Sequence, residues 1–231
     1  MAVIKPFRGV RPPPALVRDL SCLPYDVMDS DEARIMAEGK ECSLLHITRS
    51  EIDLEPGADV HSAAVYEKSA ENFKKWIDWG WLAGDRENYF YVYAQTMGGR
   101  TQYGIVGCAS VDDYLNGTIR KHELTRPDKE QDRMVHVRVN NANIEPVFFA
   151  YPAVDEIDEL VKKIVDKEPE YDFVAEDGFG HHFWVIKDQK IIEKIIELFA
   201  KIPATYVADG HHRTAAAALV IWYVDVFSAY V

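Results

Sequence analysis

Long hydrophobic runs are missing from this 231-residue chain. No stretch approaches the ~18 consecutive apolar residues that a membrane-spanning helix needs, so a membrane partner is not expected. The first six residues, Met1-Ala-Val-Ile-Lys-Pro6, also lack the basic and then apolar pattern of a secretory signal. These two absences predict a cytoplasmic protein.

Cysteine is scarce, and positive charge is outnumbered. The three cysteines, Cys22, Cys42 and Cys108, are far apart and form no CxxC pair, so we expect small buried side chains in a reducing compartment. With 26 Lys and Arg against 38 Asp and Glu, the net charge is −12. That charge opposes non-specific binding to nucleic acid, and the cations of residues 120–138 are interleaved with acids.

What is present is the composition of an ordinary globular protein, 48% hydrophobic and 28% charged. Helical periodicities and hairpin patterns alternate irregularly, which favours a single α+β domain over residues 1–231, a mixed sheet with flanking helices. A Gly-Gly pair at 98–99 between two β-rich runs predicts a hairpin. The expected helices are 30–38, with Ser30 as its cap, 62–79, 153–167 and 188–200; the expected strands are 43–47, 89–96, 101–110, 146–151, 171–175, 182–186 and 205–208.

The most informative segment is Tyr206-Val-Ala-Asp-Gly-His-His-Arg213. It predicts a strand, a tight turn at Asp209-Gly210, and a helix that begins with two histidines and an arginine. The start of a helix exposes unpaired N–H groups and the positive end of the helix dipole, and it therefore binds anions. The segment predicts a phosphate site formed by Gly210, His211, His212 and Arg213.

Two other interpretations of this segment stay open. Asp209, His211 and His212 could supply metal ligands, although neighbouring helix residues point about 100° apart, which disfavours both histidines on one ion. A second pair, His181-His182, could complete such a site or lie on the surface of a strand. Alternatively, Asp209 simply caps the helix and the histidines are exposed polar residues.

A second group of titratable side chains lies between residues 120 and 133. His122-Glu123 does not begin an HExxH zinc motif, because position 126 is Arg. A base, His122 or Glu123, close to the cations Lys121 and Arg126 suits the stabilisation of a transferring group. The alternative is a solvated loop held by salt bridges.

Four segments carry a resemblance that runs along nearly the whole chain: residues 6–12, 24–27, 121–133 and 209–213. In their sequence and order the chain resembles a large family of uncharacterised bacterial and archaeal conserved proteins, a domain of unknown function that carries the Asp-Gly-His-His-Arg motif. Members of that family are considerably longer and continue past the helix that follows the motif. This chain departs from their pattern after about Leu219 and ends on a very apolar tail, so we expect a truncated N-terminal portion of a longer protein.

More distantly, the Asp-Gly-His-His-Arg segment is similar to the signature of the ParB/sulfiredoxin superfamily, which includes CTP-hydrolysing partition proteins, sulfiredoxin and free-serine kinases. In that superfamily a glycine-and-arginine motif at the start of a helix binds nucleotide phosphates. The resemblance implies a ParB/sulfiredoxin-like strand-turn-helix near the C-terminus, with residues 210–213 holding phosphates. Asp209 would then lie near a metal ion or the attacking hydroxyl.

These patterns lead to a nucleotide-dependent phosphotransferase, a kinase acting on a small hydroxyl compound, as the expected function. The expected cofactors are Mg²⁺ and a nucleotide: ATP, ADP or CTP. Asp209 would hold the metal or accept a proton, His122 and Glu123 would take part in catalysis, and Lys121 and Arg126 would bind the nucleotide from the opposite wall. The alternatives are a ParB-like nucleotide-gated binding protein without catalysis, and a metal-dependent hydrolase using His and Asp.

Overall fold

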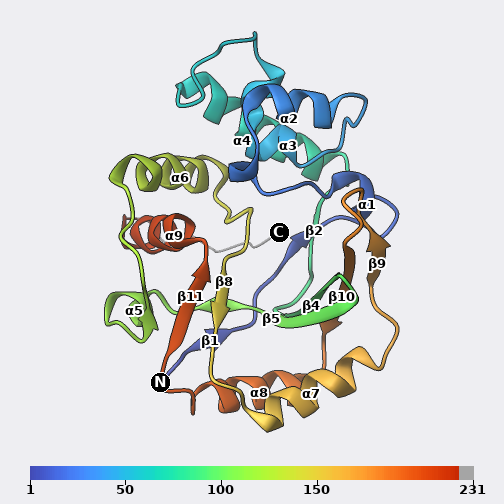
Figure 1. Ribbon diagram of the computed structural model, residues 1–231, viewed down its shortest axis with the longest axis vertical. Coiled ribbons are helices and arrows are strands. Elements are labelled where there is room, and N and C mark those ends of the chain that lie inside the picture. Colours follow the sequence, from blue (N-terminus) through green and yellow to red (C-terminus); the bar gives the residue numbers. More distant parts are fainter. Residues whose placement is uncertain (224–231) are drawn as a thin grey trace. The chain divides into compact units, whose positions relative to one another are not determined.

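The computed structural model describes the backbone of residues 1–223 and the side chains of residues 1–220. Within this range helices and several small sheets are mixed, as Figure 1 shows, which confirms the predicted α+β class. The chain forms two compact units: unit 1 from residues 1–9, 85–125 and 147–214, and unit 2 from residues 10–84, 126–146 and those from 215 onward. The single domain expected over residues 1–231 stays a prediction. Most of the apolar tail on which the expected truncation rests, residues 224–231, lies outside the described residues.

The largest sheet of unit 1 is antiparallel, with its four strands in the order β5 (Arg100–Val106), β4 (Phe90–Met97), β10 (Gly180–Ile186) and β9 (Tyr171–Val174). The hairpin predicted around the Gly-Gly pair is confirmed. Gly98 and Gly99 have φ angles of +57° and +79°, which a tight hairpin turn requires and which glycine adopts without strain.

Two amphipathic helices pack on this sheet: α7 (Asp155–Val165) and α8 (Gln189–Phe199), which lie side by side in Figure 1. Both correspond to predicted helices. Side chains of a strand alternate between its two faces, and side chains of a helix recur on one face about every 3.6 residues, so each element presents one apolar face to this core. The resulting core contains alternate residues of β4 and inner residues of both helices: Phe90, Val92, Ala94, Ile157 and Ile195.

A three-stranded sheet in unit 1 places β11 (Thr205–Asp209) between β7 (Ile119–Arg120) and β8 (Phe148–Ala150). β11 is parallel to β7 and antiparallel to β8, with its residue Tyr206 opposite Arg120 of β7. Because parallel strands end at the same edge of a sheet, the loop after β7 and the turn after β11 emerge together. The unit is completed by β1 (Ile4–Lys5), which pairs with β6 (Cys108–Ala109), and by α5 (Val111–Leu115).

Unit 2 is mainly helical and is built around α4 (Ala63–Asp78), a helix that the sequence predicts with bounds one residue wider at each end. Its apolar face contributes Phe73 and Trp76 to a core that also contains Ile47 and Leu82. A separate cluster joins α6 (Pro127–Asn140) to the later part of α9 (His211–Tyr223) through Met134, Val137, Ala216 and Val220.

The other elements of unit 2 are short. They are α1 (Val17–Leu20), η1 (Tyr25–Val27), α2 (Ser30–Ala37), α3 (Leu45–Thr48), η2 (Ser50–Asp53), and the paired strands β2 (Val10–Arg11) and β3 (Ala83–Gly84). The strand predicted for residues 43–47 is wrong, because α3 occupies this region. Leu45 and Ile47 of α3 belong to two different apolar clusters. A short apolar run does not distinguish a strand from a buried helical turn, and here tertiary packing decides.

Helix α2 begins where the sequence predicts, but its cap is a different residue. Asp29, not Ser30, accepts hydrogen bonds from the N–H groups of Asp31 and Glu32. The Glu32 side chain accepts in return from the Asp29 N–H and closes a capping box. The acidic residues that follow also favour the positive end of the helix dipole.

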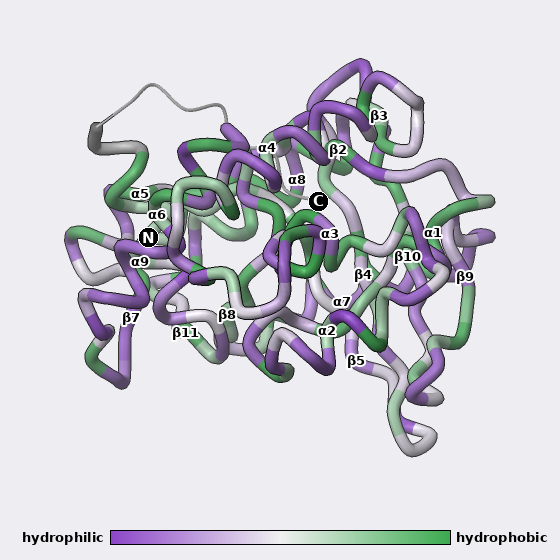
Figure 2. The backbone as a smooth tube through the Cα atoms, turned by 90° about the horizontal axis from the view of Figure 1, so that it is seen from above, coloured by the Kyte–Doolittle hydropathy of each residue, from purple (hydrophilic) through white to green (hydrophobic). Residues whose placement is uncertain are grey.

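Hydrophobic and hydrophilic residues alternate in short segments along the backbone, as Figure 2 shows. In the described part of the chain, every helix is too short or too polar to cross a membrane.

The three cysteines are free and partly buried. Burial raises the pKa of the Cys22 and Cys108 thiols to about 12, so neither is a reactive thiolate at neutral pH.

Candidate functional site

The predicted strand and turn are present in unit 1, and the predicted helix begins there: β11 ends at Asp209, and α9 begins after the single residue Gly210. Gly210 has a φ angle of +85°. A Cβ atom at this position would lie 2.8 Å from a methyl carbon of Val147 and 3.3 Å from the guanidinium carbon of Arg213. Both the conformation and the available space therefore require glycine.

The first turn of α9 contains backbone donors with no acceptor inside the helix. The first helical hydrogen bond runs from the Thr214 N–H to the Gly210 carbonyl at 2.8 Å, and the Thr214 hydroxyl donates to the same carbonyl at 2.9 Å. The N–H groups of residues 211–213 precede this bond. Donors at this position of a helix are the ones that bind anions.

Arg213 is held against the turn by Asp209. Its Nη2 atom donates to Oδ2 of Asp209 at 2.6 Å. The Arg213 side chain is 13% exposed and the Asp209 side chain is 70% exposed, so the carboxylate is the more open end of the pair. Asp209 therefore orients a guanidinium beside the start of the helix. Its predicted roles as metal ligand and proton acceptor stay predictions.

The loop after β7 brings His122 and Glu123 next to His211. The rings of His122 and His211 are nearly perpendicular, with their centroids 4.4 Å apart. Nδ1 of His211 lies 3.9 Å from Oε1 of Glu123, and one ligand atom from each of the three residues lies within 4.8 Å of the others. The parallel pairing of β7 with β11 explains this meeting of two distant segments.

Two histidine nitrogens at the start of α9 are buried without a hydrogen-bond partner among the described residues: Nε2 of His211 and Nδ1 of His212. The His211 side chain is 6% exposed. Buried polar nitrogens are nearly always satisfied in folded proteins, and exceptions mark strain, water, an ion or a functional group. The first turn of α9 therefore contains two buried polar atoms that call for a partner, which the start of a capped helix usually does not.

The predicted cations Lys121 and Arg126 lie in different units. Lys121 belongs to unit 1 with His122, and its Nζ atom lies 4.1 Å from the centre of the Tyr114 ring. Arg126 belongs to unit 2, where its Nη2 and Nε atoms donate to the Asp128 carboxylate at 2.6 Å and 3.2 Å. Within unit 1, Lys121 is thus the predicted cation on the loop that faces α9.

The second histidine pair already has partners on the four-stranded sheet. His181 shares a 2.7 Å hydrogen bond with the Tyr93 hydroxyl, and Nδ1 of His182 lies 3.0 Å from Oδ1 of Asp172. Burial lowers the pKa of His181, which favours its neutral form. Among the described residues, neither histidine joins the cluster formed with His211.

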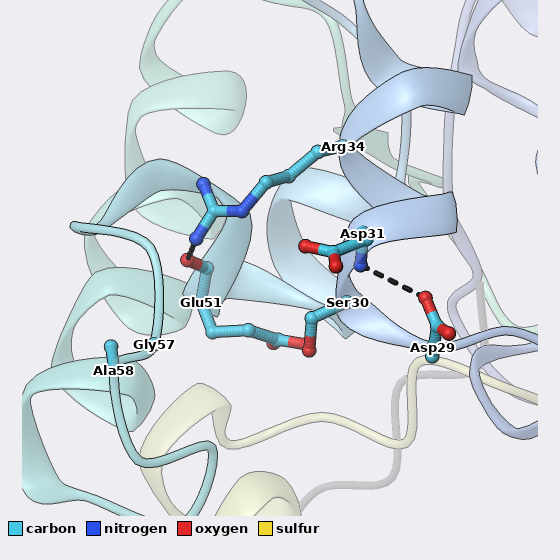
Figure 3. A pocket seen from close by; sticks show the side chains of 7 residues that line it. All are labelled: Asp29, Ser30, Asp31, Arg34, Glu51, Gly57 and Ala58. Atoms are coloured by element: carbon cyan, nitrogen blue, oxygen red, sulfur yellow. Dashed lines mark hydrogen bonds between the residues drawn. The ribbon is translucent and has the colours of Figure 1, made fainter.

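A hollow in unit 2, shown in Figure 3, has a volume of about 380 Å³, which is enough for a small ligand. Its polar groups are already engaged in local structure. Arg34 donates to the main-chain carbonyls of Glu51 and Ile52, and the Asp29 carboxylate accepts from the Asp31 N–H. We therefore place the candidate site in unit 1 and not in this hollow, whose lining residues are Asp29, Ser30, Asp31, Arg34, Glu51, Gly57 and Ala58.

A buried charged cluster in unit 2 was not foreseen from the sequence. The Asp132 side chain is 8% exposed and accepts hydrogen bonds from the Tyr66 hydroxyl at 2.7 Å and from Nδ1 of His61 at 3.0 Å. Arg133 pairs with Asp132 at 2.7 Å and lies 3.9 Å above the Tyr25 ring. These contacts are internal to unit 2 and stabilise its fold.

The sequence held one weak signal for this cluster. Arg133 is four residues before the buried Val137 and therefore shares its face of α6. A charge-rich segment is usually solvated, so composition alone predicts that Asp132 and Arg133 are exposed.

The chain matches the family described as "Protein of unknown function (DUF1015)" over residues 4–224, which includes both segments of the unit 1 site. No curated protein and no solved structure matches the chain. Because the family match covers nearly all of the sequence, the chain belongs to the DUF1015 family of proteins of unknown function.

Proposed function

We propose that unit 1 binds a nucleotide through its phosphates at the turn between β11 and α9, and that it transfers a phosphoryl group to a small hydroxyl compound. The observation that carries this proposal is the position of Arg213. Asp209 holds its guanidinium against Gly210, at the start of a 13-residue helix.

Three kinds of donor would meet a phosphate there. The N–H groups of residues 211–213 and the helix dipole favour negative charge, and the Arg213 guanidinium adds a charged donor with the planar geometry that suits phosphate oxygens. Lys121 supplies a second cation from the loop after β7. Nδ1 of His212, which is buried without a partner among the described residues, is a further polar group for a ligand to satisfy.

Phosphoryl transfer requires mainly positioning and charge neutralisation, which this set of residues can supply. Mg²⁺ would enter with the nucleotide, and Asp209, with its 70% exposed side chain, is the carboxylate of the turn that can meet it. His122 and Glu123 are the candidate bases on the facing loop. The similarity of residues 209–213 to the ParB/sulfiredoxin signature supports the same assignment.

The alternatives receive less support. A ParB-like binding protein needs a basic surface for DNA, and the net charge of −12 opposes one. A metal-dependent hydrolase would use both histidine pairs as ligands. His181 and His182 already interact with Tyr93 and Asp172, which disfavours them as metal ligands.

A thermal-shift screen of ATP, ADP, CTP and pyrophosphate, each with Mg²⁺, tests the proposal, since a ligand of the folded state raises the melting temperature. We expect at least one nucleotide to stabilise the protein and Arg213→Ala to weaken its binding by about 10-fold to 100-fold, the usual loss for a charged hydrogen bond. Arg100→Ala is the matched control, because it removes an exposed arginine of unit 1 at the β4–β5 turn. Stabilisation of wild type and Arg213→Ala to the same extent would overturn the proposal, as would no stabilisation at all.

A further inference from the structure

His122, Glu123 and His211 form a group of three possible metal ligands within unit 1. Two of them belong to the loop after β7 and the third to the first turn of α9. Local sequence patterns do not bring these segments together; the parallel pairing of β7 with β11 does. The group is therefore a product of the tertiary fold and differs from the Asp209-centred metal site expected from the sequence.

The environment of His211 is a second, independent observation. Its side chain is 6% exposed, and its Nε2 atom is buried with no hydrogen-bond partner among the described residues. Its Nδ1 atom faces Glu123 at 3.9 Å, which is too long for a hydrogen bond. A buried imidazole in this condition has lost hydration without a full replacement. An ion beside Glu123 would bind Nδ1, whereas Nε2, on the other side of the ring, would still lack a partner among the described residues. The support for the site is therefore the burial of an imidazole whose Nδ1 points at Glu123 without a hydrogen bond to it.

From this geometry we propose that His122, Glu123 and His211 bind a divalent first-row transition-metal ion such as Zn²⁺. Two imidazoles and one carboxylate are the donor set that such ions prefer, whereas Mg²⁺ and Ca²⁺ favour oxygen ligands. Three protein ligands leave at least one coordination position for water or for an oxygen of a bound ligand. Because binding to the ion occupies the basic atoms of His122 and Glu123, the metal-bound site would use neither as the catalytic base. The metal site does not require that a nucleotide bind at the neighbouring turn.

Binding requires the three ligand atoms to move closer together. Metal bonds of about 2.0–2.1 Å in a tetrahedral site place ligand atoms about 3.3 Å apart. The 3.9 Å gap between His211 and Glu123 must therefore shorten by roughly half an ångström, and the other gaps, which are within 4.8 Å, by up to about 1.5 Å. His122 is exposed and the Glu123 side chain is 55% exposed, so both can move toward the buried His211.

The test is a calorimetric titration of the chelator-treated full chain with ZnCl₂ alone, followed by visible spectroscopy of the Co²⁺-loaded protein. We expect one equivalent of Zn²⁺ to bind and His122→Ala and Glu123→Gln each to weaken binding by more than about 10-fold, the loss that removal of an outer-shell partner alone typically causes. Both positions are exposed, so these variants test the site without opening the core. Co²⁺ should give the visible absorption of a low-coordinate complex in wild type and lose it in His122→Ala.

His61→Ala is the matched control, because it removes a histidine that is 55% exposed and lies outside the group. It should bind Zn²⁺ as wild type does, and so should Arg213→Ala, which separates this site from the phosphate turn. Absence of a one-to-one complex would overturn the metal site, as would unchanged affinity in His122→Ala or in Glu123→Gln. A nucleotide that binds in the presence of Mg²⁺ while Zn²⁺ does not bind would overturn the metal site alone.

Discussion

At the scale of single residues, the stability of unit 2 depends on the buried ion pair of Asp132 with Arg133. Asp132 is 8% exposed, and its carboxylate neutralises Arg133, whose side chain is 11% exposed. Asp132→Ala would leave the guanidinium buried without its counter-charge, so we expect a loss of about 3–5 kcal/mol in the free energy of unfolding, measured in urea. Asp128→Ala on the same helix removes a 58% exposed carboxylate and should cost less than about 1 kcal/mol. Equal losses in the two variants would contradict the role of the buried pair.

His136 on α6 couples the stability of unit 2 to pH. Burial lowers its pKa from 6.5 to about 4. Between these values the unfolded chain binds a proton that the folded chain does not, so acidification from pH 6.5 toward pH 4 favours unfolding. His136→Gln can still donate to the Ile47 carbonyl but does not titrate. Urea titrations across this range should give a slope shallower by up to about 1.4 kcal/mol per pH unit than in wild type; parallel curves for the two proteins would refute the assignment.

The residues of the site differ in how far the sequence reveals them. The stretch from Asp209 to Arg213 is recognisable because its chemistry is local: a strand, a glycine turn and a helix start follow one another directly. The meeting of His122 with His211 depends on strand pairing between distant segments, which periodicity does not encode.

Outside the site, the burial of Asp132 and Arg133 is not predicted from the sequence, because a run of charges usually indicates a solvated surface.

At the scale of elements, the turn between β11 and α9 depends on one glycine. Gly210→Ala should destabilise the protein because an L-residue at a φ of +85° costs about 1–2 kcal/mol and because its Cβ would lie 2.8 Å from Val147. Gly178→Ala is the matched control: it has a φ of +84° but no atom within 4 Å of the added Cβ. Thermal unfolding should therefore show a clearly larger loss for Gly210→Ala. Equal melting temperatures for the two variants would show that the turn has room to adjust.

Elements with a long periodic signal were predicted well, and short ones less so. The amphipathic patterns of α4, α7 and α8 and the Gly-Gly hairpin between β4 and β5 are each specified by their own residues. The region of α3 is predicted as a strand from the short apolar run of residues 43–47. In the fold the side chains of Leu45 and Ile47 enter separate apolar clusters, an arrangement that a four-residue helix allows and that local sequence does not reveal.

At the scale of the whole molecule, the two units are interleaved along the chain. Each is assembled from three stretches, so neither unit corresponds to a continuous segment of sequence. Sequence patterns predict the α+β class because they identify individual helices and strands. They do not predict this division, which depends on contacts between stretches that are far apart in the chain. The candidate site lies within unit 1, where β7, β11 and the start of α9 provide its framework.

The most direct test of the central claim is an amide-resolved NMR titration of the full chain with Mg²⁺ and the nucleotide that stabilises it best. If the phosphates bind at the turn, the largest shifts should fall on the N–H groups of residues 210–214, which include the donors of the first turn of α9. Arg213→Ala should reduce these shifts at the same ligand concentration. Shifts centred elsewhere in the chain, or shifts at the turn that persist in Arg213→Ala, would contradict the account.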